Sequence, residues 1–162
     1  MTETIKFYKI NEPFGCFSNF SKFPINVNGN IWRTSEHFFQ AQKSLDTSYR
    51  LAVLNTKTAH DVVKLGRSDT LNKRQDWYEI RDNVMRFIVW KKIQQHPIIL
   101  ETLMSTDNKT IVEKAEYDDY WGDGMDGTGQ NMLGKILMEI RDEYKANGFE
   151  GASVRYDNIY LE

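Results

Sequence analysis

The chain has 162 residues, of which 40% are hydrophobic and 27% charged, and its formal net charge at pH 7 is −2. This composition is typical of a globular protein, so we predict one domain over residues 1–162 with a single core. A net charge close to zero argues against broad electrostatic binding of a nucleic-acid backbone, although one modified nucleotide could still be recognised in a pocket.

No apolar run approaches the length of a membrane-spanning helix, and the first six residues lack the basic start and apolar stretch of a signal peptide. Cys16 is the only cysteine, which excludes an internal disulfide. We therefore predict a cytoplasmic protein with no membrane contact and no obligate protein partner.

The N-terminal part is predicted to supply a small β element. Residues 5–10 alternate loosely between apolar and polar side chains, as in a strand. Residues 25–32 carry an Asn-Gly step between two short β-prone runs, which predicts a hairpin. Residues 14–20, rich in aromatics but broken by small residues, are predicted to form a loop in which Asn19 is the anchored polar residue.

Helices are predicted to dominate the rest of the chain, giving a mainly α (α+β) fold. A first helix begins after an N-cap at Thr34 or Ser35, a short one covers residues 58–65 and stops at Gly66, and the longest covers residues 75–95. Pro97 opens another helix, and residues 110–112 form a brief strand. A last helix, starting near residue 132, is predicted to end at residues 147–148, and the tail at 149–162 is left unassigned apart from a strand-like stretch at 156–161.

The first helix carries a polar arc formed by Glu36, Gln40 and Lys43, which is predicted to face away from the core. The opposite face carries the predicted core residues Phe38, Ala41 and Leu45. At about 1.5 Å per residue, the helix would place the two charged positions about 10 Å apart.

The polar arc has two interpretations. Glu36 and Lys43 could be ordinary solvated charges that complement the two ends of the helix dipole. However, Phe39 falls beside the arc, and Trp32 and Arg33 come immediately before the helix. An aromatic wall beside a carboxylate and an amine is typical of a cleft.

A glycine-rich segment at residues 121–131 leads into the last helix. Its glycine spacing formally matches the dinucleotide-binding fingerprint, but no buried strand precedes it and its aspartates would repel a pyrophosphate, so we reject the match. The glycines either serve only the tight turns of a long connection or let the backbone approach a ligand. In the second case Trp121 would stack on a base or cover a sugar, and Asp123 and Asn131 would bind ribose hydroxyls.

No metal and no cofactor are predicted. The three histidines lack ligand spacing, and the aspartates near the glycine-rich segment do not follow the calcium-loop pattern. Cys16 is interpreted as a small apolar residue packed among phenylalanines rather than as a nucleophile.

Several runs of residues together resemble the NADAR, or YbiA-like, family. They are FSNF at 17–20, WRTSEHFFQAQK at 32–43, GR at 66–67, YWGDG at 120–124 and GQNMLG at 129–134, and the similarity extends from about residue 7 to residue 144. The resemblance implies a compact, mostly helical domain that acts as an N-glycosidase on ribosylated amines. Two substrate classes are associated with the family: ADP-ribose on the amino group of guanine, removed by antitoxin-like members, and phosphorylated ribosylamino-pyrimidine intermediates of riboflavin synthesis.

Through this resemblance, Glu36 and Lys43 match the acidic and basic positions of the family's active site. The positions assigned to substrate binding are Asn19, Trp32, Arg33, Phe39, Gln40, Arg67, Trp121, Gly122, Asp123 and Asn131. Lys43 is expected to displace the base through a Schiff base, with Glu36 as acid and base, while direct attack by water that Glu36 activates is the alternative.

The expected function is removal of ADP-ribose from guanine in nucleic acid. The alternatives are cleavage of a nucleotide-like riboflavin intermediate, binding of ADP-ribose or NAD without cleavage, and a scaffold role through exposed aromatics. The combination of Glu36 and Lys43 favours an enzyme over a binding module.

Overall fold

The computed structural model describes residues 2–160. In chain order its elements are β1 (Thr4–Phe7), the 3-10 helix η1 (Gly15–Phe17), β2 (Ile25–Val27), β3 (Asn30–Trp32), α1 (Ser35–Ala41), α2 (Thr47–Asn55), α3 (Ala59–Gly66), α4 (Trp77–Gln95), α5 (Pro97–Met104), β4 (Thr110–Glu113) and α6 (Met132–Tyr156). Helices dominate, which confirms the predicted α+β class.

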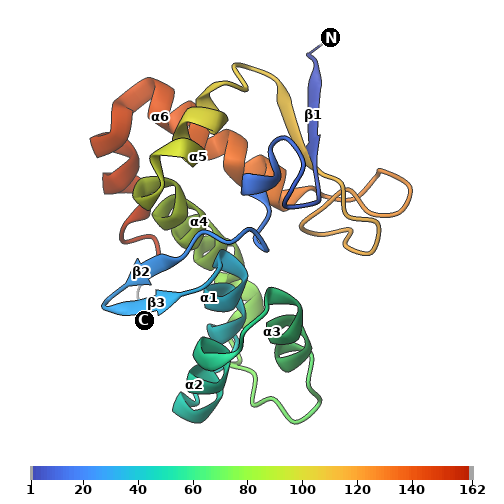
Figure 1. Cartoon of the computed structure of the whole chain (residues 1–162), viewed down its shortest axis with the longest axis vertical. Coiled ribbons are helices and arrows are strands. Elements are labelled where there is room, and N and C mark those ends of the chain that lie inside the picture. Colours follow the sequence, from blue (N-terminus) through green and yellow to red (C-terminus); the bar gives the residue numbers. More distant parts are fainter. Residues whose placement is uncertain (1, 161–162) are drawn as a thin grey trace.

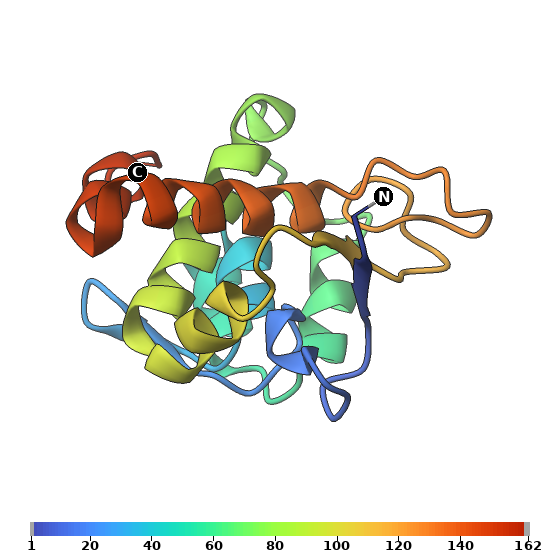
Figure 2. The ribbon, with the colours of Figure 1, turned by 90° about the horizontal axis from the view of Figure 1, so that it is seen from above.

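Helix α4 runs through the middle of the molecule, with α1, α2 and α3 on one side and α5 and α6 on the other (Figure 1). Figure 2 shows α6 stretched across the other helices. Apolar residues of α4 recur every three or four positions, so Val84 and Ile88 are fully buried, while Arg86 pairs with Glu139 of α6 at 2.9 Å. These contacts make α4 the centre of the fold, as its periodicity predicted.

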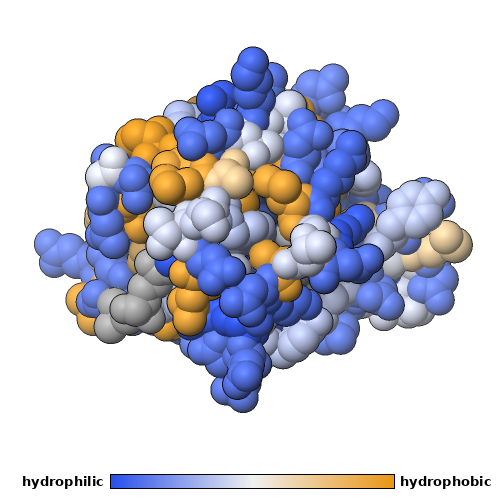
Figure 3. Space-filling model, turned by 90° about the horizontal axis from the view of Figure 1, so that it is seen from below, coloured by the Kyte–Doolittle hydropathy of each residue, from blue (hydrophilic) through white to orange (hydrophobic). Residues whose placement is uncertain are grey.

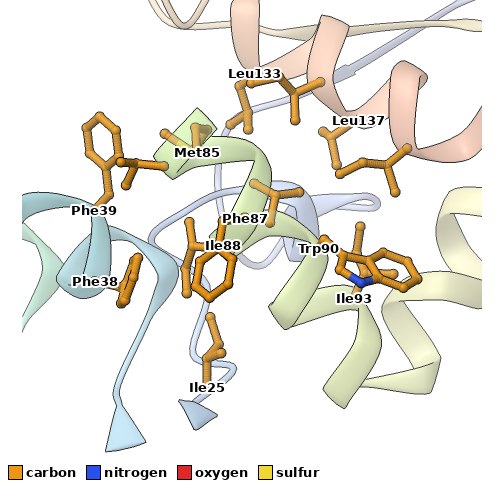
Figure 4. Packing of buried hydrophobic residues seen from close by; sticks show 14 of the residues in the cluster. Ile25, Phe38, Phe39, Met85, Phe87, Ile88, Trp90, Ile93, Leu133 and Leu137 are labelled. Atoms are coloured by element: carbon orange, nitrogen blue, oxygen red, sulfur yellow. The ribbon is translucent and has the colours of Figure 1, made fainter. Parts of the chain in front are cut away.

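The core joins side chains from helices that are distant in the sequence. In Figure 4, Phe38 of α1 lies on one side of the α4 residue Ile88, and Leu133 and Leu137 of α6 lie on the other. Each of these side chains is buried. Because α1 and α6 pack on the same central helix, the polar residues at their ends are held in fixed relative positions.

The β element consists of two separate pairs of strands. β2 and β3 form an antiparallel hairpin in which Asn28 (φ 52°) and Gly29 (φ 89°) occupy the turn, which confirms the Asn-Gly prediction. β1 pairs in parallel with β4, and Phe7 lies opposite Glu113 at the end of both strands. The predicted strand at 5–10 is therefore shorter than expected, because its partner ends there.

Three predictions for the helices need correction. α1 ends at Ala41, so Leu45 lies beyond it and is 63% exposed rather than part of the core. Helix α2 was not predicted. Gly148 (φ 70°) interrupts α6 without ending it, the chain is helical again to Tyr156, and residues 157–160 form a turn and a bend instead of the predicted strand.

The second part of α6 forms because it has a core contact of its own. Tyr156 is fully buried and its ring lies 6.2 Å from that of Trp90 on α4. Of the predicted strand-like stretch, residues 161–162 lie outside the described part of the chain.

On the face that Figure 3 shows, hydrophobic residues gather mainly in one group at the upper left, and hydrophilic residues cover most of the rest. Within residues 2–160, no helix combines the length and the apolar character needed to cross a membrane.

Candidate active site

A cavity of about 1280 Å³ opens beside α1 and α3. Its wall is formed by segments far apart in the sequence: the residues after β1, the loop before β2, α1 with its following turn, α3, and the end of β4 with the loop after it. The predicted site residues that line it are Asn19, Arg33, Glu36, Phe39, Gln40, Lys43, Arg67 and Trp121. The two regions singled out in the sequence therefore meet around one cavity.

The start of α1 is fixed by the loop that carries Asn19. Thr34 caps the helix by accepting a hydrogen bond from the backbone of His37 (3.2 Å). The backbone N–H of Glu36 donates to the carbonyl oxygen of Asn19 (3.1 Å), and the Ser35 hydroxyl donates to the Asn19 side-chain oxygen (2.8 Å). Asn19 thus positions Glu36 at the cavity wall.

The buried side chain of Lys92 also fixes the loop that carries Asn19. Nζ of Lys92 donates to the carbonyl oxygens of Cys16 (2.6 Å) and Ser18 (2.9 Å) and to the hydroxyl of Ser21 (2.7 Å). Burial lowers the pKa of Lys92 to about 7. Cys16 packs against the core, and burial raises the pKa of its thiol, which disfavours the thiolate that a nucleophile needs.

The polar arc of α1 is buried, contrary to the solvent-facing interpretation. Glu36 is 8% exposed and Gln40 5%, and the Gln40 side-chain amide donates to the Glu36 carboxylate at 2.6 Å. Lys43 lies in the turn after the helix, so the ideal helical separation of about 10 Å does not apply. Gly66 lies so close that a Cβ there would be 1.9 Å from Oε1 of Gln40 and 3.3 Å from Nζ of Lys43.

The electrostatics of the site move both charged groups toward their neutral forms. Burial raises the pKa of Glu36, although the hydrogen bond from Gln40 and the charge of Lys43 act in the opposite direction. Burial lowers the pKa of Lys43, Glu36 opposes this shift, and the nearby cations Lys73 and Arg67 add to it. A larger fraction of free amine at Lys43 is the state that nucleophilic attack requires.

Aromatic rings form one wall of the cavity. The ring of Phe39 lies 5.0 Å from that of Trp77 and 5.3 Å from that of Trp121, between centroids. Nζ of Lys43 lies 6.0 Å from the Trp77 ring centroid. Phe39 and Trp121 line the cavity, and Trp77 is buried beside them, so the surroundings of the Lys43 amine are apolar on this side.

Other predicted binding residues do not line the cavity. Trp32 is buried against Phe38, with ring centroids 5.6 Å apart. Asp123 pairs with Lys114 (3.1 Å), and a Cβ on Gly122 would lie 2.4 Å from that of Ala115.

The side chain of Asn131 does not line the cavity either, and instead forms hydrogen bonds with backbone groups of β4. Its side-chain oxygen accepts from the N–H of Glu113 and its nitrogen donates to the carbonyl oxygen of Ile111, both at 2.9 Å. The geometry thus gives Gly122, Asp123 and Asn131 contacts that hold the glycine-rich loop against β4.

Two cavity carboxyls, Glu113 and Glu116, escaped the analysis of the sequence, and a third, Asp118, was considered there only among the aspartates that might hold a cation. Ile111 is buried, and Glu113 shares its side of β4 because side chains alternate along a strand. A charged residue at an inward-facing strand position was the signal that could have identified Glu113. Burial, together with the neighbouring acids Asp118, Glu36 and Asp123, raises the pKa of Glu113 to about 8.

The C-terminal tail lies behind the turn that carries Lys43. The hydroxyl of Tyr160 donates to the Gln42 side chain (3.0 Å) and accepts from the Arg74 guanidinium (3.1 Å). The backbone N–H of Arg74 in turn donates to the carbonyl oxygen of Lys43 (2.8 Å). Among residues 2–160, no group of three or more His, Cys, Asp or Glu side chains is placed to hold a metal ion.

Comparison with known proteins gives consistent matches. A family model described as "NADAR domain" matches residues 6–145. The chain is 41% identical over 139 residues to N-glycosidase YbiA of Shigella flexneri, covering 86% of this chain and 87% of that protein. It is 39% identical over 145 residues to N-glycosidase Npun_R5314 of Nostoc punctiforme, covering 88% and 93%.

A longer relative and a solved structure also match. The riboflavin biosynthesis protein VVA0006 of Vibrio vulnificus is 41% identical over 143 residues, which are 88% of this chain but 39% of that protein. The NMR structure of the E. coli protein YbiA superimposes with a TM-score of 0.84 at 38% identity, covering 92% of this chain and 89% of that one.

Proposed function

The chain belongs to the NADAR domain family and is a hydrolase of N-glycosyl bonds, and on that premise we propose that it removes ADP-ribose from the amino group of guanine in nucleic acid. Membership confirms the resemblance read from the sequence motifs. The choice of substrate and the roles of individual residues are the part that we propose.

One observation carries the proposal: Glu36 and Lys43 line the same cavity, where burial lowers the pKa of Lys43 and so favours its free amine. A binding module has no need of an amine with a lowered pKa beside a carboxyl, whereas covalent catalysis does.

The volume of the cavity and the charged residues in its wall favour ADP-ribose as the group that the enzyme removes. Ligand pockets commonly enclose about 300–1,000 Å³, and this one encloses about 1280 Å³. Arg33, Lys57 and Arg67 line it and supply positive charge for a pyrophosphate. Trp121 supplies a ring on which a base can stack.

In the proposed mechanism, the sugar ring opens as its C1–O4′ bond breaks, O4′ takes a proton, and C1 becomes an iminium carbon bonded to the guanine amine. The Lys43 amine then forms a bond to C1, and the C1–N bond to guanine breaks with its electron pair left on that nitrogen, which is protonated. Water adds to the resulting Lys43 imine, the C1–Nζ bond breaks, and free ADP-ribose and the lysine amine are restored.

Glu36 acts as the base in this scheme. The cations Lys43 and Arg67 and the hydrogen bond from Gln40 favour its carboxylate form. A carboxylate in this position can accept the proton of the attacking water and stabilise positive charge at C1. If Lys43 did not react covalently, the same carboxylate would activate water for direct attack.

The test is turnover of ADP-ribosylated guanosine, with release of ADP-ribose measured by chromatography, followed by borohydride trapping. We expect a reduced adduct on Lys43 and a loss of at least 100-fold in kcat for Lys43→Ala. Lys135→Ala, which removes an exposed lysine of α6, is the matched control and should be unaffected. A fully active enzyme that yields no adduct would contradict the covalent route.

A second candidate substrate is a phosphorylated ribosylamino-pyrimidine, because one relative is named a riboflavin biosynthesis protein. Turnover of both substrates under the same conditions separates the two proposals. Binding of ADP-ribose with no cleavage of either substrate would instead support the non-catalytic alternative.

A further inference from the structure

Glu113 stands in the wall of the cavity that contains Glu36 and Lys43, although it comes from a distant part of the chain. It is the last residue of β4, opposite Phe7 of β1. Its backbone N–H donates to the Asn131 side chain (2.9 Å), and its carbonyl oxygen accepts from the backbone N–H of Asp123 (3.0 Å). Glu113 is therefore fixed by the strand pair on one side and by the glycine-rich loop on the other.

The carboxyl group of Glu113 has no hydrogen bond or ion pair with any residue between 2 and 160. The other acids around it are engaged: Asp123 with Lys114 (3.1 Å), Asp118 with the backbone N–H of Trp121 (2.8 Å), and Glu36 with Gln40 (2.6 Å). Of the cavity-lining residues Glu36, Glu113 and Asp118, Glu113 is the one whose carboxyl oxygens are available to a ligand, and the remaining cavity carboxyl, that of Glu116, belongs to an exposed residue.

We propose that Glu113 is the acid that protonates the leaving amine, a role that rests on the proposed N-glycosidase function. Its carboxyl faces the same cavity as the lysine that attacks C1, and it comes from a different wall than Glu36. An acid and a base on separate walls can serve two sides of one reacting carbon.

The surroundings of the two glutamates explain why Glu113, rather than Glu36, holds the proton. The neighbours that shift Glu36 include the cations Lys43 and Arg67 as well as Asp118. Those that shift Glu113 are the acids Asp118, Glu36 and Asp123, which with burial raise its pKa to about 8. When two carboxyls share a site, the one surrounded by negative charge ionises last.

Other titratable groups border the same cavity. Tyr8 and Lys9 follow β1, and Glu116 follows β4. None of them forms a hydrogen bond or ion pair with the Glu113 carboxyl within residues 2–160.

As the C1–N bond breaks, its electron pair stays on the guanine nitrogen, which takes the proton of the Glu113 carboxyl and leaves as the neutral amine. Glu113 is then a carboxylate. When water later adds to the Lys43 imine, one of its protons passes through Glu36 or solvent, and Glu113 regains a proton before the next turnover.

The experiment compares kcat between pH 5 and 9.5 for the wild type, Glu113→Gln and Glu101→Gln, with ADP-ribosylated guanosine and a phosphorylated ribosylamino-pyrimidine as substrates. Glu101→Gln removes an exposed carboxyl of α5 and is the control for the change in net charge. We expect Glu113→Gln to lose about 100-fold or more in kcat, the usual contribution of a general acid. The fall in wild-type kcat above about pH 8 should disappear in this variant, and the control should match the wild type.

Thermal unfolding of each variant distinguishes a catalytic loss from a folding defect, because the glutamine keeps the size of the side chain. A Glu113→Gln variant that is folded and keeps both the wild-type kcat and the alkaline fall would overturn this role alone. No turnover of either substrate by the wild type would overturn the proposed function and this role together.

Discussion

Replacing Gly66 with alanine should lower the activity of the enzyme while changing its stability only slightly. Gly66 is the last residue of α3 and does not have a positive φ, so alanine fits its backbone and should raise helix stability by up to about 1 kcal/mol. However, the new Cβ would lie 1.9 Å from Oε1 and 2.9 Å from Cδ of Gln40, which is closer than real contacts allow. The Gln40 amide must therefore move.

Moving that amide breaks its 2.6 Å hydrogen bond to Glu36. A hydrogen bond to a charged group contributes about 1.5–3 kcal/mol, and about 1.4 kcal/mol corresponds to a tenfold change in rate. For Gly66→Ala we therefore expect kcat to fall about 10- to 100-fold. The melting temperature should change by only about 2–4 °C, since 1 kcal/mol has an effect of that size in a chain of this length.

Steady-state kinetics and thermal unfolding of Gly66→Ala, Gln40→Ala and the double variant provide the test. If the methyl group acts by displacing the amide, removing the amide first makes Gly66→Ala almost neutral, so the double variant should match Gln40→Ala. Wild-type kcat in Gly66→Ala would refute the reasoning. So would a double variant much slower than Gln40→Ala, because the damage would then come from another contact.

Four further results are expected. Asn131→Ala leaves two backbone groups of β4 unpaired and should lower the free energy of unfolding in urea by about 1–3 kcal/mol; a raised KM with unchanged stability would instead indicate a ligand contact. Because burial lowers the pKa of Lys92 to about 7 in the folded state, the unfolded chain binds more protons above that pH. The free energy of unfolding should therefore rise between pH 7 and about 10, and this rise should be smaller in Lys92→Met. Trp121→Ala removes a stacking surface and should raise KM about tenfold or more, with kcat changed less. Tyr160→Phe removes the hydroxyl that links Gln42 to Arg74 behind the turn carrying Lys43, and it should lower kcat a few-fold in a folded enzyme. An unchanged kcat would show that these two hydrogen bonds are not needed.

Features encoded by neighbouring residues were predictable from the sequence. The Thr34 cap, the Asn-Gly hairpin and the helix that opens at Pro97 each depend on a local backbone preference. Helix α2 escaped prediction because Val53 is its only buried residue, so it has no apolar stripe to recognise. Its contacts include hydrogen bonds to backbone carbonyl oxygens, from the Tyr49 hydroxyl to Gln40 and from the Arg50 guanidinium to Ser44, both at 2.8 Å.

The interruption at Gly148 shows a limit of local signals. An Asn-Gly pair ends many helices, and Gly148 does adopt a positive φ. The chain nevertheless returns to a helix, because Tyr156 can be buried against Trp90. That contact joins residues too far apart in the sequence to be inferred from spacing.

For the site, the sequence supplied the residue types but not all of their partners. Glu36 and Lys43 were identified by their motif and do share one cavity. The side chain of Asn131 looks the same in a sequence whether it binds a ligand or a backbone group, and the structure shows the second. Glu113 could not be placed beside Glu36 without the pairing of β1 with β4.

The parallel pairing of β1 with β4 also bears on synthesis of the protein. Thr4 lies opposite Thr110, so the first strand emerges from the ribosome long before its partner does. Until then its hydrogen-bonding edge is exposed on the nascent chain, where it can associate with other unfolded polypeptides. The acid of β4 and the residues after β1 reach a common wall only once that pairing forms, so the enzyme becomes competent late in its own translation, when most of its helices have already been made.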